Sequence, residues 1–314
     1  MRFIAAEELR NLLDYPFLVE GLARLHREAP PEVDRLLMEQ AGDDGGAPDF
    51  FMIWQAWQPG QVLGSKLMTG FPANPGSGLP TIQGVYLLFD GRDGRPLACI
   101  DGTELTYWKT AADSALGADF LATRDASVLL MVGAGAMAPH LIRAHLAVRP
   151  SIDRVLVWNR TAARAAELAG SLDLDDASVE IAHDLEAAAA SADVICCATA
   201  SRVPVIEGAW LKPGSHLDLV GSFTNEMREA DDEAARRARI CVDSRWFTIG
   251  QCGDITGPLR SGAIVEADIT ADLFDLCQGR APGRQQASEI TLFKNAGGAH
   301  LDLMVARLIM ERAA

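Results

Sequence analysis

The chain has 314 residues, 49% of them hydrophobic and 23% charged, and a formal net charge of −15. This composition is typical of a globular protein, and the length exceeds the size at which a single core stops growing, so we expect two domains. A negative surface repels polyphosphates, so neither nucleic acids nor anionic membranes are expected as partners. No secretory signal and no membrane-spanning stretch is recognisable, which predicts a cytoplasmic protein.

The six cysteines show no CxxC spacing and no Cys/His zinc pattern, so no metal site is expected. They are predicted to be buried free thiols in a reducing compartment. Cys196 and Cys197 are adjacent in an expected strand and point to opposite faces, which makes them a poor disulfide pair. The six histidines are scattered, and we expect each of them to be structural.

The first part of the chain is expected to combine helices with an antiparallel sheet. Residues 1–28 show apolar residues at helical spacing. Between about residues 50 and 101, short apolar runs alternate with Pro-Gly, Asn-Pro-Gly and Gly-Arg-Asp-Gly turns, which predicts strands, with a hairpin over 85–100. A long helix is then expected over 103–122, with Thr103 or Asp101 as its N-cap.

From about residue 126 onward, strand and helix patterns alternate. This alternation predicts a parallel, doubly wound sheet. A final helix is expected over 299–313. The six strand candidates are residues 127–132, 154–158, 178–182, 193–198, 216–220 and 239–243.

The segment SVLLMVGAGAMAP joins a strand to a helix through a glycine-rich turn. Gly133 permits the tight turn, Gly135 lets the backbone approach a pyrophosphate, and Ala138 allows close packing of helix on strand. The helix N-terminus then presents free N–H groups to the anion. The segment predicts a dinucleotide site, and the alternative is a turn without a ligand. The loop residues expected at the cofactor are Gly133, Gly135, Ala136 and Met137.

The second strand of this region ends in Asn159, where a NAD site normally carries an acidic residue for the ribose 2′-hydroxyl. Asparagine removes the charge that would repel a 2′-phosphate, and Arg160 can pair with that phosphate and stack on adenine. Thr161 and Arg164 follow on the next helix and are also expected at the cofactor. We therefore expect NADP(H), with NAD(H) as the alternative. The other interpretation of Arg160 is an exposed residue at a helix start.

The sequence resembles the ornithine cyclodeaminase/μ-crystallin family. The resemblance lies in GSKLMTGFPANP, GLPTIQG, VGAGAMAP, VWNRTAARAAELA, HLDLVGSFTNEMREADDE and SEITLFKNAGGA, and it spans most of residues 60–300. It implies an α/β fold in which a Rossmann domain, residues 125–295, is inserted in a split α+β domain, residues 1–124 plus 296–314. The split domain would bind the substrate and form a homodimer through its antiparallel sheet.

The resemblance also implies site residues. Lys66 takes the place of the family lysine that binds the substrate carboxylate, and Lys109 stands where the family usually has arginine, so the cation remains but bidentate geometry is lost. Arg228 would lie near the substrate. For Lys66, the alternative is a lysine whose ammonium reaches water from a strand edge. For Lys109 it is an exposed helix lysine, and for Arg228 it is a residue of a charged, solvated helix. Further positions carried over are Thr81 at the nicotinamide and substrate, and Thr199, Val220 and Asn295 at the cofactor.

Phe223 separates two branches of the family. Cyclodeaminase members carry an aspartate at this position, which acts on the substrate amine, and a phenyl ring cannot replace it. The stretch VGSFTNEMREAD is instead similar to the ketimine reductase branch, where Phe223 would border the substrate. The resemblance then implies hydride transfer from NADPH to the C=N carbon of Δ1-pyrroline-2-carboxylate or Δ1-piperideine-2-carboxylate, giving proline or pipecolate. Ornithine cyclodeaminase, a related amino acid dehydrogenase and a non-enzymatic cofactor-dependent binding protein stay open as alternatives.

Overall fold

The structure is a computed structural model that describes residues 1–41 and 48–313. Contacts divide the chain into two units, one of residues 1–109 with 298–314 and the other of residues 110–297. The first division falls inside a long helix, α3 (Gly102–Leu121), and therefore earlier than the expected boundary after residue 124. The domain boundaries at 124/125 and 295/296 stay a prediction.

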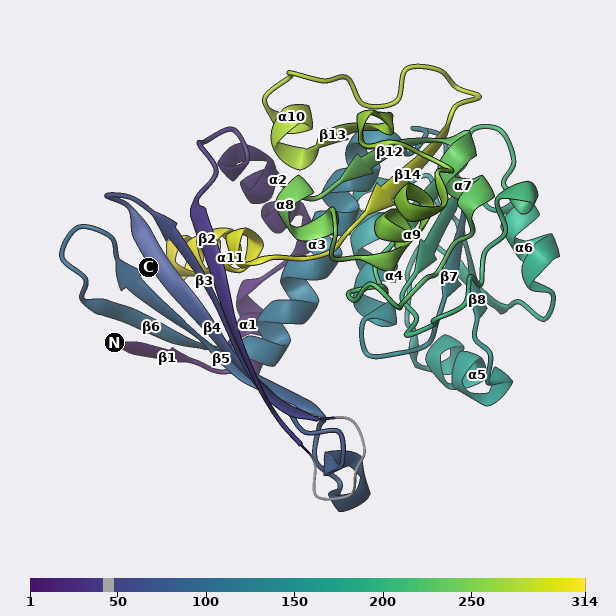
Figure 1. The fold of residues 1–314 in the computed structure, drawn as a ribbon. Helices are drawn as coiled ribbons and strands as arrows, with labels where there is room; N and C mark the ends of the chain where they lie inside the picture. The colour runs from purple at the N-terminus through teal and green to yellow at the C-terminus, as the bar shows by residue number, and fades with distance from the viewer. Residues whose placement is uncertain (42–47, 314) are drawn as a thin grey trace. The chain divides into compact units, whose positions relative to one another are not determined.

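The first unit is built on a six-stranded sheet (Figure 1). Its strands are β1 (Arg2–Ile4), β2 (Glu32–Gln40), β3 (Asp49–Gln58), β4 (Val62–Gly70), β5 (Ile82–Asp90) and β6 (Pro96–Asp101). They lie in the order β1-β6-β5-β4-β3-β2, antiparallel except for the β1–β6 pair. Gly60 and Gly94, with φ of 72° and 73°, make the turns after β3 and β5. The predicted hairpin is thus confirmed as β5 and β6.

Helices cover one face of this sheet. They are α1 (Ala6–Leu12), α2 (Tyr15–Leu25), α11 (Ala299–Arg312) and the start of α3, whereas a short 3-10 turn, η1 (Asn74–Ser77), lies in the connection between β4 and β5. Helix α11 packs on β3 and β4 and on α2, and is buried along most of its length. Residues 1–28 were expected to be helical throughout, but β1 comes first, because three residues are too few to show an alternating pattern.

Helix starts follow the expected capping chemistry. Asp14 separates α1 from α2, and its carboxylate accepts the N–H of Phe17 at 2.8 Å. At the start of α3, Asp101 Oδ1 accepts the N–H of Glu104 at 2.8 Å. Of the two candidate caps, Asp101 therefore caps α3.

The second unit holds an eight-stranded sheet in which every pair is parallel. Its strands are β7 (Val128–Val132), β8 (Arg154–Trp158), β9 (Ser178–Ile181), β10 (Val194–Cys197), β11 (His216–Leu219), β12 (Ala238–Val242), β13 (Ile269–Asp272) and β14 (Ile290–Lys294). Their order is β13-β12-β14-β11-β10-β7-β8-β9. All six strand candidates are confirmed, as is the doubly wound fold. Strand β14 lies between β11 and β12 although it comes last in the chain.

Short helices connect the strands and flank the sheet (Figure 1). They are α4 (Ala138–Val148), α5 (Ala162–Ser171), α6 (Leu185–Ser191), α7 (Asp232–Arg237), α8 (Arg245–Thr248), α9 (Gly253–Ser261) and α10 (Leu273–Cys277), with η2 (Gly208–Trp210) and η3 (Glu266–Asp268). The chain order reverses between β7 and β10, where β8 lies on one side of β7 and β10 on the other. Ligands of such sheets bind at this switch point, beyond the carboxyl ends of the strands.

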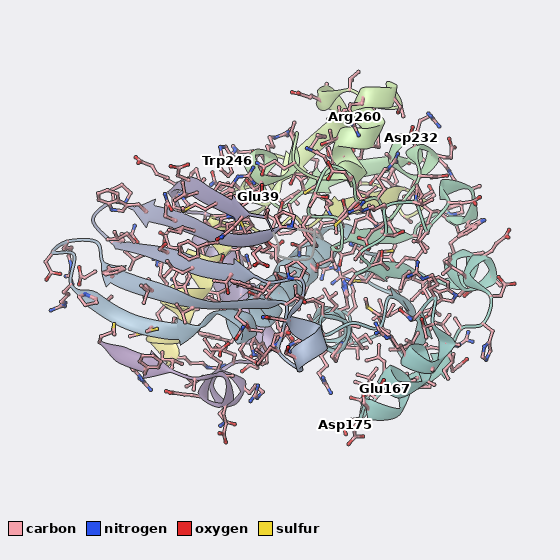
Figure 2. All side chains as sticks on the ribbon, turned by 60° about the horizontal axis from the view of Figure 1, so that its bottom comes forward. Glu39, Glu167, Asp175, Asp232, Trp246 and Arg260 are labelled. Atoms are coloured by element: carbon pink, nitrogen blue, oxygen red, sulfur yellow. The ribbon has the colours of Figure 1, made fainter. Side chains whose placement is uncertain are left out.

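Acidic side chains on the surface account for the negative charge. Figure 2 shows Glu167 and Asp175 pointing away from the ribbon, and both are exposed. Among the helices that the structure describes, none is both long and apolar enough to cross a membrane.

Candidate active site

Two lysines of the first unit converge on one carboxylate. Lys66 on β4 places Nζ 3.2 Å from Asp302 Oδ1, and Lys109 on α3 places Nζ 3.3 Å from Asp302 Oδ2. The lysines are 2% exposed and Asp302, on α11, is 0% exposed. Both lysines therefore lie inside the unit, and the interpretations of Lys66 as a strand-edge lysine and Lys109 as an exposed helix lysine are wrong.

Strand alternation explains why Lys66 points inward. Gly64 and Lys66 are buried, whereas Leu63, Ser65 and Leu67 are more accessible on the other face of β4. Lys66 also hydrogen-bonds to the hydroxyl of a threonine on α3, Thr106.

Lys109 has two further contacts within the first unit. Its ammonium donates to the backbone oxygen of Gly298 at 3.2 Å, and it lies 5.7 Å from the centre of the Trp54 ring. A cation over an aromatic face is a favourable contact when it is shielded from water. These contacts fix the Lys109 ammonium, which has no bidentate fork of its own.

The lysine cluster, defined here as Lys66, Lys109 and Asp302, has unequal charges. Burial lowers the pKa of Lys66 to about 8, Asp302 opposes that shift, and Lys109 adds to it. With both lysines protonated, two cations share one anion. A buried site with this imbalance is suited to one further carboxylate, because the added anion would bring the local charge to zero. Asp302 was missed by sequence reasoning, since an aspartate inside a final helix resembles any surface acid.

Next to this cluster lies a buried phenol. Tyr86 on β5 pairs with Lys66 on β4, and its hydroxyl has no hydrogen-bond partner in the described part of the chain. Burial and the nearby Asp302 raise its pKa well above the usual value, so the hydroxyl stays protonated.

A phosphate loop follows β7 in the second unit. Gly133 has φ of 110°, and a Cβ there would lie 2.6 Å from the Ala198 oxygen after β10, so only glycine fits. A Cβ on Gly135 would meet nothing within 4 Å, which leaves open space where the helix begins. The loop therefore has the closed turn and the open cradle that a dinucleotide phosphate requires.

The end of β8 is tied to this loop. Asn159 Oδ1 accepts the N–H of Ala134 at 3.3 Å, and its Nδ2 donates to the Thr161 oxygen at 3.0 Å. Arg160 and Arg164 are exposed, and neither forms an ion pair with any residue that the structure describes. Both guanidinium groups are thus available to an anion beside the loop.

A buried glutamate joins the segments after β10 and β11. Glu229 Oε1 accepts from the backbone N–H and the hydroxyl of Thr199, at 2.6 and 2.9 Å, and its Oε2 accepts from the N–H of Gly221 at 2.6 Å. Val220 precedes Gly221, so both expected cofactor residues of this edge adjoin these contacts. Sequence reasoning missed Glu229, because it lies within a charged run, Arg-Glu-Ala-Asp-Asp-Glu, that resembles a solvated surface.

The other expected site residues have contacts of their own. Arg228 donates to Asp232 Oδ1 at 2.8 Å and is partly buried, so it is not simply solvated. Phe223 is 65% exposed within the second unit. Asn295 is buried, and its Nδ2 donates to the Thr110 oxygen at 2.9 Å and to a serine hydroxyl. Their contacts with substrate or cofactor stay predictions.

Thr81 belongs to the first unit, as do Lys66 and Lys109. It precedes β5 and is half-buried. The structure therefore brings the lysines together within one unit, and the loop residues together at one edge of the second unit's sheet. The expected residues that the structure places in the second unit are Gly133, Gly135, Ala136, Met137, Asn159, Arg160, Thr161, Arg164, Thr199, Val220, Phe223, Arg228 and Asn295.

Among residues 1–41 and 48–313, one trio of possible metal ligands occurs that the sequence did not suggest. His145 Nε2 lies 3.1 Å from Asp218 Oδ2, and Cys196 Sγ donates to the same oxygen at 3.2 Å. All three are fully buried. Because one carboxylate oxygen already accepts both hydrogen bonds, the geometry is that of a hydrogen-bonded core network.

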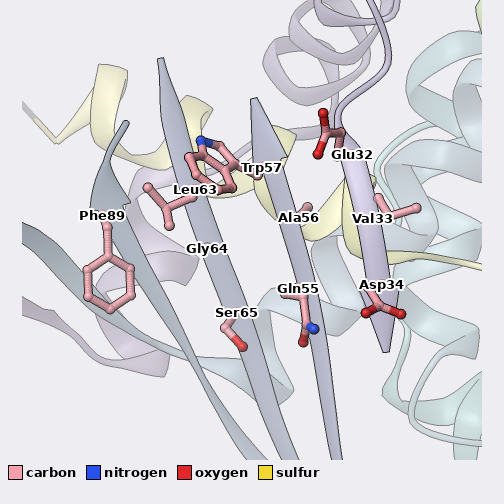
Figure 3. A pocket seen from close by; sticks show the side chains of 10 residues that line it. All are labelled: Glu32, Val33, Asp34, Gln55, Ala56, Trp57, Leu63, Gly64, Ser65 and Phe89. Carbon is pink, nitrogen blue, oxygen red and sulfur yellow. The ribbon is translucent and has the colours of Figure 1, made fainter. Parts of the chain in front are cut away.

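A concavity of about 350 Å³ lies elsewhere, on the outer face of the first sheet. Trp57, Leu63 and Phe89 are on its wall (Figure 3). Lys66 points to the opposite face of β4, so this concavity is separate from the lysine cluster.

Fold and phosphate loop together define a dinucleotide-binding protein of the Rossmann type. Residues 50–314 match the model of the ornithine cyclodeaminase/mu-crystallin family, and the chain belongs to that family.

Named relatives cover nearly the whole chain. It is 49% identical to a Delta(1)-pyrroline-2-carboxylate reductase of Paracoccus denitrificans, over 98% of this chain and 96% of that protein. It is 34% identical to the ketimine reductase mu-crystallin of Rattus norvegicus, with the same coverage. Among solved structures it is similar to Thermococcus litoralis Delta(1)-pyrroline-2-carboxylate reductase in complex with NADH and L-proline, with a TM-score of 0.91 at 29% identity, over 100% and 97% of the two chains. The chain is an oxidoreductase.

Proposed function

We propose that the protein reduces the C=N bond of a cyclic imino acid, Δ1-pyrroline-2-carboxylate or Δ1-piperideine-2-carboxylate, to proline or pipecolate. The observation that carries the proposal is the lysine cluster, in which two buried ammonium groups share one carboxylate. The cluster has one positive charge in excess, and the substrate offers one carboxylate. The relatives named as reductases of this substrate support the same reaction.

The cofactor is a nicotinamide dinucleotide, which supplies the hydride when bound. Gly133, Gly135 and the start of α4 hold its pyrophosphate, since the loop combines a left-handed turn with open space above it. Asn159 and Arg160 meet the adenine ribose. No carboxylate ends β8, and Arg160 is exposed and unpaired among the described residues, so NADPH is preferred over NADH.

The protein's own residues orient the substrate. Lys66 and Lys109, both shielded from water, hold the substrate carboxylate and thereby fix the orientation of the ring. Thr81 is the third residue of the first unit that is proposed at the substrate, and Arg228 is the residue of the second unit to which the family resemblance gives this role. Phe223 supplies an apolar border, so that water does not compete along the path of the hydride. The proposal takes the imine to arrive protonated from solution, so it requires no acid from the protein.

Of the three alternative functions, only the cyclodeaminase is disfavoured by a residue of this chain. A cyclodeaminase requires a carboxylate at the position of Phe223. An amino acid dehydrogenase would use the same two lysines, and a binding protein would keep the loop without turnover. The dehydrogenase would act on a different substrate and the binding protein on none, so a turnover assay separates both from the reductase.

The active form is a homodimer assembled through the outer face of the first sheet. Side chains on this face alternate with the buried ones along each strand. Several are large, apolar and exposed, and a group of such side chains on one face is typical of an interface. They are Leu36, Met38, Phe51, Trp57 and Val85. None of the six cysteines, all of them within the described residues, is in a disulfide, which supports a reducing cytoplasm as the location.

The experiment is an NADPH-oxidation assay with the purified protein. Δ1-Pyrroline-2-carboxylate and Δ1-piperideine-2-carboxylate are compared with pyruvate plus an amine and with ornithine. The proposal expects turnover of the cyclic imines above all others. Faster turnover of an open-chain substrate would replace it with the dehydrogenase, and no turnover of any would favour the binding protein.

A further inference from the structure

Two chain segments border the switch point of the second unit's sheet, one after β10 and one after β11. Thr199 follows β10 and is close to the phosphate loop, since a Cβ on Gly133 would lie 3.3 Å from Thr199 Cγ2. Gly221 follows β11, which pairs with β10. A dinucleotide that places its pyrophosphate on the loop extends its nicotinamide half along this edge of the sheet.

Glu229 is the one described side chain that hydrogen-bonds to both segments. Each of its carboxyl oxygens accepts a backbone N–H at 2.6 Å, one from Thr199 and the other from Gly221. The chain around Glu229 is fixed as well, because its own N–H donates to Asp254 Oδ1 at 2.7 Å.

A second layer of buried charge holds this arrangement. Asp254 Oδ2 lies 3.4 Å from Lys294 Nζ, and Lys294 donates to the Leu219 oxygen at 3.0 Å, at the end of β11. Glu229 and Lys294 are 0% exposed and Asp254 is 2% exposed. The Glu229 carboxyl group therefore belongs to a hydrogen-bonded network that is attached to the end of β11.

We propose that Glu229 is a positioning residue for the nicotinamide half of the cofactor, acting through Thr199 and Gly221. Among the described residues, the hydrogen bonds of this network end at Thr199 and include neither the phosphate loop nor Asn159, so the adenosine half should be affected much less than the nicotinamide half. The inference rests on the proposed binding of a nicotinamide dinucleotide, and it does not depend on which imino acid is reduced.

Glu229→Gln is the informative change. An amide has one oxygen, whereas two backbone N–H groups need one each, so an NH₂ group must face an N–H in either orientation. This holds whether or not the carboxyl group is protonated, which matters because burial and nearby Asp254 raise the pKa of Glu229 to about 8.

The test measures two dissociation constants by calorimetry, for NADPH and for adenosine 2′,5′-bisphosphate, which lacks the nicotinamide half. Glu229→Gln should weaken NADPH binding about tenfold and leave the bisphosphate within about twofold. A general loss of structure would weaken both ligands alike, and that result, or no change in either, would overturn the proposal.

Asp193→Asn is the matched control. Asp193 Oδ2 accepts the N–H groups of Ser127 and Val128, at 2.8 and 2.9 Å. These residues lie at the amino ends of β10 and β7, whereas Glu229 acts at the carboxyl ends of the strands. Its loss should lower Tm without changing the ratio of the two dissociation constants. If this control changed the ratio as much as Glu229→Gln, the effect would not belong to the switch point and the proposal would fail.

Should Glu229→Gln fail to fold, Thr199→Val and Thr199→Ser decide. Valine removes the hydroxyl bond to Glu229 and serine keeps it. Valine should weaken NADPH about threefold, serine should match the wild type, and the bisphosphate should be unaffected by either. Equal NADPH binding by valine and serine would contradict the proposal.

Discussion

Lys66 and Asp302 are 236 positions apart in the sequence, yet Lys66 Nζ lies 3.2 Å from Asp302 Oδ1 with both side chains buried. Strand β4 supplies the lysine and the last helix, α11, the aspartate. Since Lys109 meets the other oxygen of Asp302, the split first unit is what assembles the cluster. The chain must therefore return to its first unit at its end for the site to exist.

Lys66→Ala tests the role of the cluster. Removing one cation leaves Asp302 and Lys109 balanced, so no excess charge remains for the substrate carboxylate. We expect kcat/KM for the imino acid to fall about a hundredfold, because a buried charge pair is lost. The dissociation constant of NADPH and the circular dichroism spectrum are the controls, and both should be unchanged. Near-normal kinetics would make Lys66 a structural residue.

The pH dependence of substrate binding should report Lys66. Burial lowers its pKa from 10.5 to about 8, so the cation is lost as pH rises through 8. The KM of the imino acid should then increase about fivefold between pH 8 and pH 9.

Unfolding does not explain such an increase. Between pH 8 and 10.5 the unfolded chain binds the Lys66 proton more tightly than the folded chain, so this group makes folding more favourable as pH rises. Lys66→Arg keeps its charge and should flatten the profile, while the substrate's own ionisation affects both proteins equally. An equally steep profile in Lys66→Arg would assign the dependence to another group.

Arg160→Ala tests the cofactor preference. Loss of a guanidinium contact with the 2′-phosphate should raise the KM of NADPH about tenfold and leave that of NADH unchanged. Arg124→Ala, which removes an exposed arginine that pairs with Asp119, should change neither. If the wild type used NADPH and NADH with equal efficiency, the preference would be refuted.

Phe223→Asp separates reduction from cyclisation. An anion beside a carboxylate-bearing substrate should weaken imine reduction through like-charge repulsion. The variant should still release no ammonia from ornithine, because a single carboxylate does not supply the other amine contacts. Phe223→Leu is the matched control and should keep most of the activity. A larger loss in the leucine variant than in the aspartate variant would contradict the charge argument.

Local patterns predicted the elements of the fold better than the partners of its buried charges. The phosphate loop and six parallel strands depend on short-range glycine placement and apolar runs, and all were recognisable. The partner of Lys66, by contrast, comes from a helix 236 positions away. Glu229 has the same neighbours in sequence as a surface acid, and only the fold shows that it is buried. Strand β1 was missed because it is completed by β6, far along the chain.

The most direct test of the central claim is the steady-state oxidation of NADPH with Δ1-pyrroline-2-carboxylate, measured for the wild type and for Lys66→Ala together with ammonia release from ornithine. We expect rapid imine reduction by the wild type, a loss of about a hundredfold in the variant, and no ammonia from either. Ammonia release from ornithine by the wild type at a rate above its imine reduction would contradict it.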